Sequence, residues 1–85
     1  MKVVNVRKEK CSVYIGRPSI FGNPFVIGKD GNREQVIVKY KEYALNNSKL
    51  LVAIKGLKDN DVLGCYCAPL ACHGDVIVQI WKGGE

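Results

Sequence analysis

The N-terminal part of the chain alternates apolar and polar positions, whereas the middle and the end carry a helix-like repeat. Residues 2–6 and 11–15 alternate and are rich in β-branched side chains, which predicts two short strands joined by a charged turn at residues 7–10. We expect these strands to form a hairpin or to lie next to each other. Residues 61–67 lack helical periodicity and predict a further, buried strand.

Three segments have the apolar spacing of amphipathic helices, at about residues 32–46, 48–56 and 75–81. Each has a candidate N-cap whose side chain can accept a free backbone N–H, namely Asn32 with Gln35 as a capping-box partner, Ser48, and Asp75. The residues predicted to face the core are Val36, Tyr40, Tyr43, Ala44, Leu50, Leu51, Ile54, Leu57, Val76, Ile77, Ile80 and Trp81.

The order strand, strand, loop, helix, helix, strand, loop, helix predicts the α/β class. We expect a small sandwich with a short mixed or partly parallel sheet and about three helices. Residues 32–57 are long enough for the crossover that joins parallel strands. A chain of 85 residues holds one hydrophobic core, so residues 1–85 are predicted to be a single domain.

The first loop, residues 16–25, contains two prolines and two glycines and is neither helix nor long strand. Arg17 and Asn23 each precede a proline and are therefore held in extended conformation. The planar guanidinium of Arg17 suits phosphate or carboxylate, and Ser19 and Asn23 add polar contacts, so all three are candidate ligand-binding residues. The alternative is structural: Asn23 satisfies backbone groups while the two phenylalanines of the loop fill the edge of the core.

Three of the four cysteines and the single histidine fall within residues 65–73. Zinc prefers thiolate and imidazole ligands in a tetrahedron, which makes Cys65, Cys67, Cys72 and His73 candidate metal ligands and zinc a candidate cofactor. Adjacent residues at the start of a helix tend to diverge, which weighs against Cys72 and His73 sharing a metal. Cys11 is a candidate distant ligand. The alternative is that the cysteines are small buried residues of the core.

The same segment allows a catalytic interpretation. A cysteine at the N-terminal edge of a helix, beside a histidine, can have a lowered pKa and act as a nucleophile. Cys72 is then the candidate nucleophile, His73 its base or acid, and Asp75 the partner of the imidazole.

A third interpretation is capture of an anion. The helix N-terminus around Gly74 presents backbone N–H groups, His73 adds a donor, and Arg17 completes the site. Residues 1–42 carry nine Lys or Arg against four Asp or Glu, whereas residues 43–85 carry four of each, so the whole net charge of +5 lies in the first half and attracts anions.

These observations favour a non-catalytic binding module for a small anionic, nucleotide-like ligand. The alternatives are a Cys/His-dependent enzyme acting on a nucleotide-like substrate, and a zinc-stapled adaptor for nucleic acid or protein. Aromatic residues are sparse near the basic turn at residues 7–10, which argues against a platform for stacking single-stranded nucleic acid. No apolar run reaches the length of a membrane span or a signal-peptide core, so we expect a cytoplasmic protein with no membrane partner.

Residues 13–19 (VYIGRPS), 22–25 (GNPF) and 64–75 (GCYCAPLACHGD) together resemble a family of small phage and bacterial proteins known as domain of unknown function 4326. The resemblance extends from about Val13 to Trp81, and the family has an aromatic residue where Tyr66 stands. It implies a phage or prokaryotic origin. The expected location is the cytoplasm, which is the host cytoplasm if a phage encodes the protein. It also implies that the first loop and a second loop, residues 67–75, belong to one module. All three prolines, Pro18, Pro24 and Pro69, lie in these two loops, as expected for rigid connections, so we expect the loops to pack side by side. The residues it groups into one site are Arg17, Asn23, Cys65, Cys67, Cys72 and His73.

Overall fold

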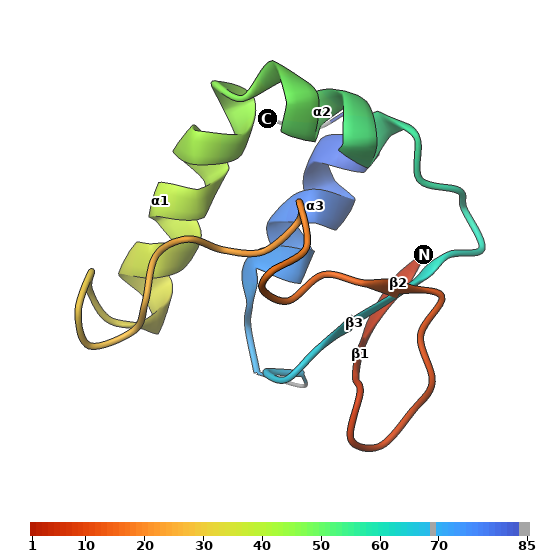
Figure 1. The fold of residues 1–85 in the computed structure, drawn as a ribbon, viewed down its shortest axis with the longest axis horizontal. Coiled ribbons are helices and arrows are strands. Elements are labelled where there is room, and N and C mark those ends of the chain that lie inside the picture. The colour runs from red at the N-terminus through yellow and green to blue at the C-terminus, as the bar shows by residue number, and fades with distance from the viewer. Residues whose placement is uncertain (69, 84–85) are drawn as a thin grey trace.

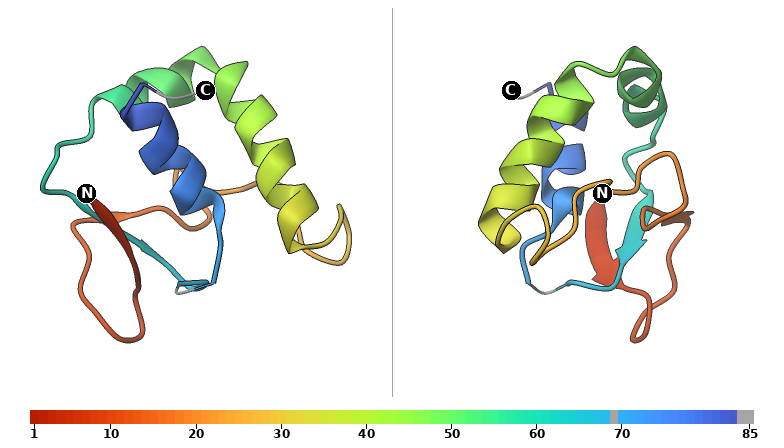
Figure 2. Two further views of the ribbon diagram at one scale, coloured as in Figure 1. Left: turned by 180° about the vertical axis from the view of Figure 1, so that it is seen from behind. Right: turned by 60° about the vertical axis from the view of Figure 1, so that its left-hand side comes forward.

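The computed structural model describes residues 1–68 and 70–83 and shows a three-stranded parallel sheet with three helices (Figure 1). The strands are β1 (Lys2–Asn5), β2 (Val13–Tyr14) and β3 (Val62–Cys65), and the helices are α1 (Arg33–Leu45), α2 (Ser48–Lys55) and α3 (His73–Trp81). The helices gather on one side of the sheet, as the turned views in Figure 2 show. The predicted α/β class is confirmed.

The predicted pairing of the first two strands is wrong. The order in the sheet is β1-β3-β2, so β3 lies between the two N-terminal strands and Leu63 pairs with both Val3 and Val13. Alternation identifies a strand and its faces but not its partner, and β3, the most buried of the three strands, takes the central position. Residues 6–12 therefore form a return loop that leads from the end of β1 to the start of β2 (Figure 1).

Gly64 in the central strand is required by the close approach of this return loop. A Cβ at Gly64 would meet the side chains of Val6 and Cys11, each about 2.5 Å away. Neighbouring residues of a strand point to opposite faces, so Cys11 covers the face of β3 opposite to Cys65.

The helices agree with the predicted segments, but two of the three N-caps differ. Asn32 and Gln35 form the predicted capping box of α1. The N-cap of α2 is Asn47, not Ser48, and the N-cap of α3 is Cys72, not Asp75. Asp75 lies inside the first turn of α3, where its carboxylate accepts a hydrogen bond from the Cys72 N–H at 3.1 Å. The negative charge of this carboxylate also interacts favourably with the positive end of the helix dipole.

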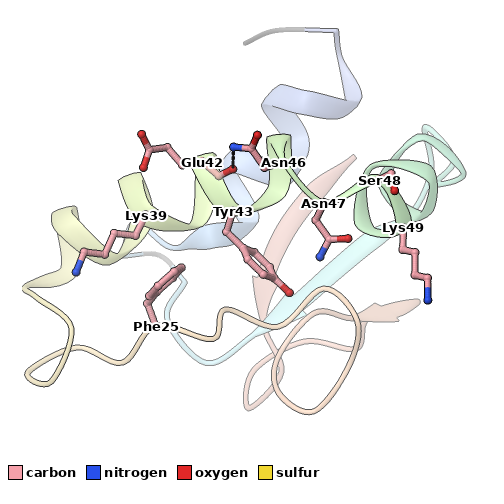
Figure 3. A pocket seen from close by; sticks show the side chains of 8 residues that line it. All are labelled: Phe25, Lys39, Glu42, Tyr43, Asn46, Asn47, Ser48 and Lys49. Atoms are coloured by element: carbon pink, nitrogen blue, oxygen red, sulfur yellow. Dashed lines mark hydrogen bonds between the residues drawn. The ribbon is translucent and has the colours of Figure 1, made fainter.

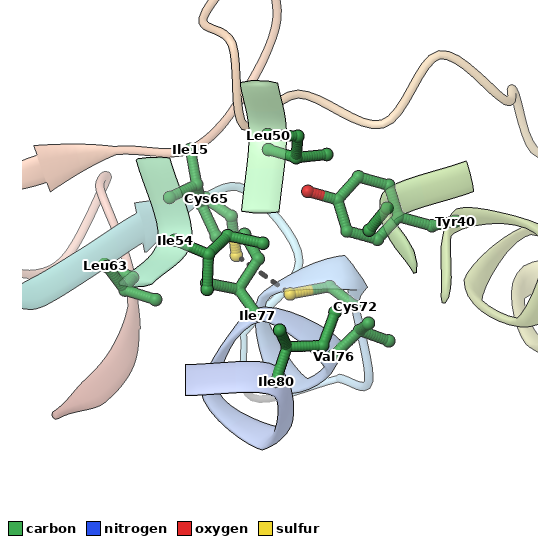
Figure 4. Close-up of a cluster of buried hydrophobic side chains, with 11 residues drawn as sticks. Ile15, Tyr40, Leu50, Ile54, Leu63, Cys65, Cys72, Val76, Ile77 and Ile80 are labelled. Carbon is green, nitrogen blue, oxygen red and sulfur yellow. Dashed lines mark hydrogen bonds between the residues drawn. The ribbon is translucent and has the colours of Figure 1, made fainter. Parts of the chain in front are cut away.

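The core lies between the sheet and the helices and includes two of the cysteines (Figure 4). Most of the predicted core face is buried: Val36, Tyr40, Ala44, Leu50, Ile54, Val76, Ile77 and Ile80. Tyr43, Leu51, Leu57 and Trp81 are half-buried around it. Within the described residues, no helix is both long enough and apolar enough to cross a membrane.

Candidate functional site

The C-terminal ends of β2 and β3 meet the first turns of α1 and α3 at one edge of the sheet, and a pocket of about 500 Å³ opens there. We call it the strand-end pocket. In open parallel sheets this edge is where ligands bind. Residues from the first loop, among them Arg17, and from the second loop, among them His73, line it together. The structure thus places the two loops side by side; Pro69, one of the three loop prolines, lies outside the described residues.

The first loop is attached to α1 by two side chains. Tyr40, fully buried in α1, donates its hydroxyl to Phe21 O at 2.9 Å. The Asn23 amide donates to Val36 O at 3.3 Å, and its Oδ1 accepts the Phe25 N–H at 2.9 Å. Asn23 lines the pocket, but both ends of its amide are used inside the protein, as the structural alternative expects.

The thiols of Cys65 and Cys72 form a buried pair with their sulfur atoms 3.4 Å apart (Figure 4). Cys72 Sγ also accepts the Gly74 N–H at 3.3 Å, so this thiol is part of the cap of α3. Burial raises the pKa of the Cys72 thiol well above its ordinary value, and the helix N-terminus does not compensate. The lowered pKa that the catalytic interpretation expects of Cys72 is therefore not supported.

His73 connects the start of α3 to the end of β2. Its Nε2 donates to Ile15 O at 2.7 Å, which leaves Nδ1 as the acceptor, and its ring packs against Tyr40 with centroids 5.0 Å apart. The side chain is 8% exposed, and burial, together with the charge of Arg17, lowers its pKa and keeps it neutral. We call Cys65, Cys72 and His73 the buried wall of the pocket.

The described residues do not fit the predicted zinc site. No group of three or more His, Cys, Asp or Glu side chains within residues 1–68 and 70–83 is arranged to hold a metal ion. The reason is that two of the candidate ligands point in different directions. The sulfur of Cys72 faces Cys65, whereas the ring of His73 faces Ile15. Cys11 lies against Gly64 and does not join them.

Two arginines line the strand-end pocket from different elements. Arg17 projects from the first loop and is exposed, and Arg33 stands at the first position of α1, where its Nη1 donates to Ala71 O at 3.0 Å. No carboxylate is found among the described residues that line the pocket. We call Arg17 and Arg33 the cationic wall. Sequence reasoning missed Arg33, although a cation at a helix N-terminus opposes the dipole and is itself a signal.

Two other predicted ligand-binding residues lie away from the pocket lining. Ser19 Oγ is enclosed and has no hydrogen-bond partner among the described residues. Gly74 is buried, and a Cβ there would lie 2.9 Å from Ile15 Cδ1 and from Val3 Cγ1. Gly74 therefore allows close packing between α3 and the sheet, and its N–H already donates to Cys72 Sγ.

Two tyrosines that the residue patterns did not single out form the outer rim of the pocket. Tyr14 and Tyr66 meet edge to face with ring centroids 6.2 Å apart, and they are 37% and 56% exposed. The Arg7 guanidinium lies 5.3 Å from the centroid of the Tyr66 ring. Only the family resemblance pointed to an aromatic residue at position 66.

A second hollow, which we call the α1–α2 groove, lies at the junction of those helices (Figure 3). At about 890 Å³ it is larger than the strand-end pocket. Its lining mixes Lys39 and Lys49 with the carboxylate of Glu42, and Lys39 Nζ already donates to Asp30 O at 2.7 Å. The lining of the α1–α2 groove thus contains a carboxylate, whereas the described lining of the strand-end pocket contains none.

The fold and the site define a small α/β domain with a cationic pocket at the carboxyl edge of a parallel sheet. Residues 2–83 match the family described as "Domain of unknown function (DUF4326)", and the chain belongs to this family. A protein of Enterobacteria phage T4, described as "Uncharacterized 12.4 kDa protein in nrdA-td intergenic region", is 36% identical over an alignment of 87 positions that covers 93% of this chain and 75% of the relative. No solved structure matches the chain.

Proposed function

We propose that the protein is a non-catalytic binding module for a small anionic, nucleotide-like ligand, held in the strand-end pocket, in a phage or prokaryotic setting. The observation that carries the proposal is the cationic wall: Arg17 and Arg33 line one pocket whose described lining contains no carboxylate. Two guanidinium groups without acidic partners favour an anion, and each offers a planar set of donors that matches a phosphate group.

The size and chemistry of the pocket agree with such a ligand. A volume of about 500 Å³ lies in the range typical of small-molecule sites, roughly 300–1,000 Å³. Phe25 and Ile37 provide apolar surface beside the two arginines. This combination suits a molecule with a charged group and an apolar or planar part, whereas a free inorganic anion would leave that surface unused.

The two alternative functions lack a comparable observation. The enzyme needs a reactive Cys72, but its thiol is buried and its pKa is raised. The zinc-stapled adaptor needs converging ligands, which the described residues do not provide. Binding needs only the arrangement that the pocket already has.

The proposal is tested by calorimetric titration with nucleoside 5′-monophosphates. Arg17→Ala should weaken binding by about 2–4 kcal/mol, because it removes a charge-assisted contact shielded from water, and Arg17→Lys should lose a sizeable fraction of that amount. The matched control is Lys49→Ala, which removes a cation from the α1–α2 groove and should leave affinity unchanged. The nucleotide should be recovered intact after incubation.

Equal affinity of wild type, Arg17→Ala and Arg33→Gln would contradict the cationic wall as the binding element. Turnover of the nucleotide would contradict a non-catalytic role. If Arg17→Ala unfolds the domain while the remaining folded fraction binds normally, Arg17 is a structural clamp between the loops and the proposal is wrong.

A further inference from the structure

The rim of the strand-end pocket presents aromatic surface that folding alone does not require. Tyr66 follows β3 directly, is 56% exposed, and contributes no side chain to the core cluster. Tyr14, at the end of β2, stands edge-on to it. Since neighbouring parallel strands end at the same edge, the sheet itself brings these two rings together beside the cationic wall.

The return loop adds a cation, Arg7, next to one of the two rings. Arg7 lies 5.3 Å from the centroid of the Tyr66 ring, within the range of a cation–π contact. Aromatic residues are sparse near the basic turn in the sequence, but the fold places Tyr66, which follows β3, next to Arg7.

One side chain holds both Arg7 and Tyr66 in place. Asn5 Oδ1 accepts the Arg7 N–H at 2.9 Å, while Asn5 Nδ2 donates to Tyr66 O at 3.3 Å and to Ala68 O at 3.1 Å. Asn5 is the last residue of β1, so the outer strand fixes the backbone on both sides of the contact. The sheet thus holds the backbone from which the exposed ring and the guanidinium project.

We infer that Tyr66, supported by Tyr14 and Arg7, forms a stacking surface for the base of a nucleoside phosphate whose phosphate group contacts the cationic wall. This inference rests on the proposed function and specifies its ligand class. A planar base can stack on an exposed tyrosine ring and interact with a guanidinium, and the π-face needed for this is common to every base. A sugar phosphate or inorganic phosphate has no group that uses this surface.

The same lining predicts weak selection among bases. Reading a base edge requires free side-chain donors and acceptors, but both ends of the Asn23 amide are engaged, and so is His73 Nε2. Discrimination then depends on stacking strength, which is greater for purines than for pyrimidines. We expect purine nucleotides to bind more tightly, with all four affinities within about tenfold of one another.

The test compares AMP, GMP, CMP and UMP with ribose 5-phosphate by calorimetry at one salt concentration. Ribose 5-phosphate should bind roughly 5- to 100-fold more weakly than AMP, as expected for the loss of one base–aromatic stack. Tyr66→Ala should reduce AMP affinity to the level of ribose 5-phosphate and leave ribose 5-phosphate binding unchanged. Tyr66→Phe, the matched control, keeps the ring and should retain AMP affinity.

Three results would overturn the inference while leaving the proposed function intact: equal affinities of AMP and ribose 5-phosphate, equal weakening of both by Tyr66→Ala, or a spread above a hundredfold among the four nucleotides. Far-UV circular dichroism of Tyr66→Ala should match wild type, since the ring is outside the core and its loss leaves the secondary structure intact. Failure of every phosphate compound to bind wild type would overturn the proposed function and this inference with it.

Discussion

The buried wall and the cationic wall face the same pocket but have opposite relations to the rest of the protein. Cys65, Cys72 and His73 are all nearly inaccessible, and each has a polar partner within the protein. Arg17 is exposed, and no acidic side chain neutralises it within the described pocket lining. The residues that look most reactive in the sequence therefore contribute to folding, whereas the less conspicuous arginines remain available to a ligand.

The size of the domain explains why reactive residue types are used in this way. A chain of 85 residues buries a limited area, so small thiols near a helix N-terminus add to its core. Cys72 combines packing with capping of α3, and His73 closes the junction between α3 and β2. Substitutions in each wall therefore test whether the buried wall contributes to stability and the cationic wall does not.

The largest effect on stability should come from the buried wall. His73→Ala leaves Ile15 O buried without its donor and opens a void beside Tyr40, which together should reduce the free energy of unfolding by about 3 kcal/mol. Arg17→Ala should change it by less than about 0.5 kcal/mol, because it opens no cavity. Urea denaturation followed by circular dichroism measures both.

His73→Gln provides the matched control, since its amide can donate to Ile15 O and should recover part of the loss. Equal destabilisation by His73→Ala and Arg17→Ala would remove the distinction between the walls.

A smaller effect should appear in thiol reactivity. Cys65 and Cys72 are 2% and 4% exposed, whereas Cys11 and Cys67 are half-buried. We expect iodoacetamide to modify the two buried thiols about a hundredfold more slowly at neutral pH, which corresponds to about 2.7 kcal/mol in activation free energy, because reaction requires local opening and deprotonation. Mass spectrometry of peptides from a timed reaction gives each rate.

Unfolded protein in denaturant is the control, in which all four thiols should react at similar rates. Rapid modification of Cys72 in the folded protein would restore it as a candidate nucleophile and contradict its place in the buried wall.

The smallest effect should be a pH dependence that connects the two walls. Burial and, to a lesser extent, the charge of Arg17 lower the pKa of His73 below its ordinary value near 6.5. Below that value the unfolded chain binds more protons than the folded one, so the free energy of unfolding should fall as pH decreases from 6.5 toward the folded pKa of His73. Urea denaturation across this pH range measures the change.

His73 is the single histidine of the chain, so His73→Gln should abolish this dependence between pH 6.5 and the onset of carboxylate titration. Arg17→Ala should weaken it, because one of the two causes is removed. An unaltered pH profile in His73→Gln would show that another group is responsible.

Local patterns in the sequence were sufficient to locate the secondary-structure elements and to predict the class of fold. Helical periodicity and the Asn32–Gln35 capping box located α1, and alternation located the two N-terminal strands. Proline and glycine marked the first loop, and Arg17, predicted as a candidate from its residue type alone, lines the strand-end pocket. These features follow from spacing and residue type within a few turns of chain, where neighbours in sequence are also neighbours in space.

Which segments meet, and which side chains remain free, depends on contacts between residues that are distant in the sequence. The insertion of β3 between β1 and β2 overturned the hairpin, placed Tyr66 beside Tyr14 and Arg7, and brought Arg33 to the same pocket as Arg17. Whether a cysteine or histidine reacts or packs depends on its burial and its hydrogen-bond partners. Both are set by residues far away in the sequence, and for that reason the roles of Cys72 and His73 could not be predicted from their own segment.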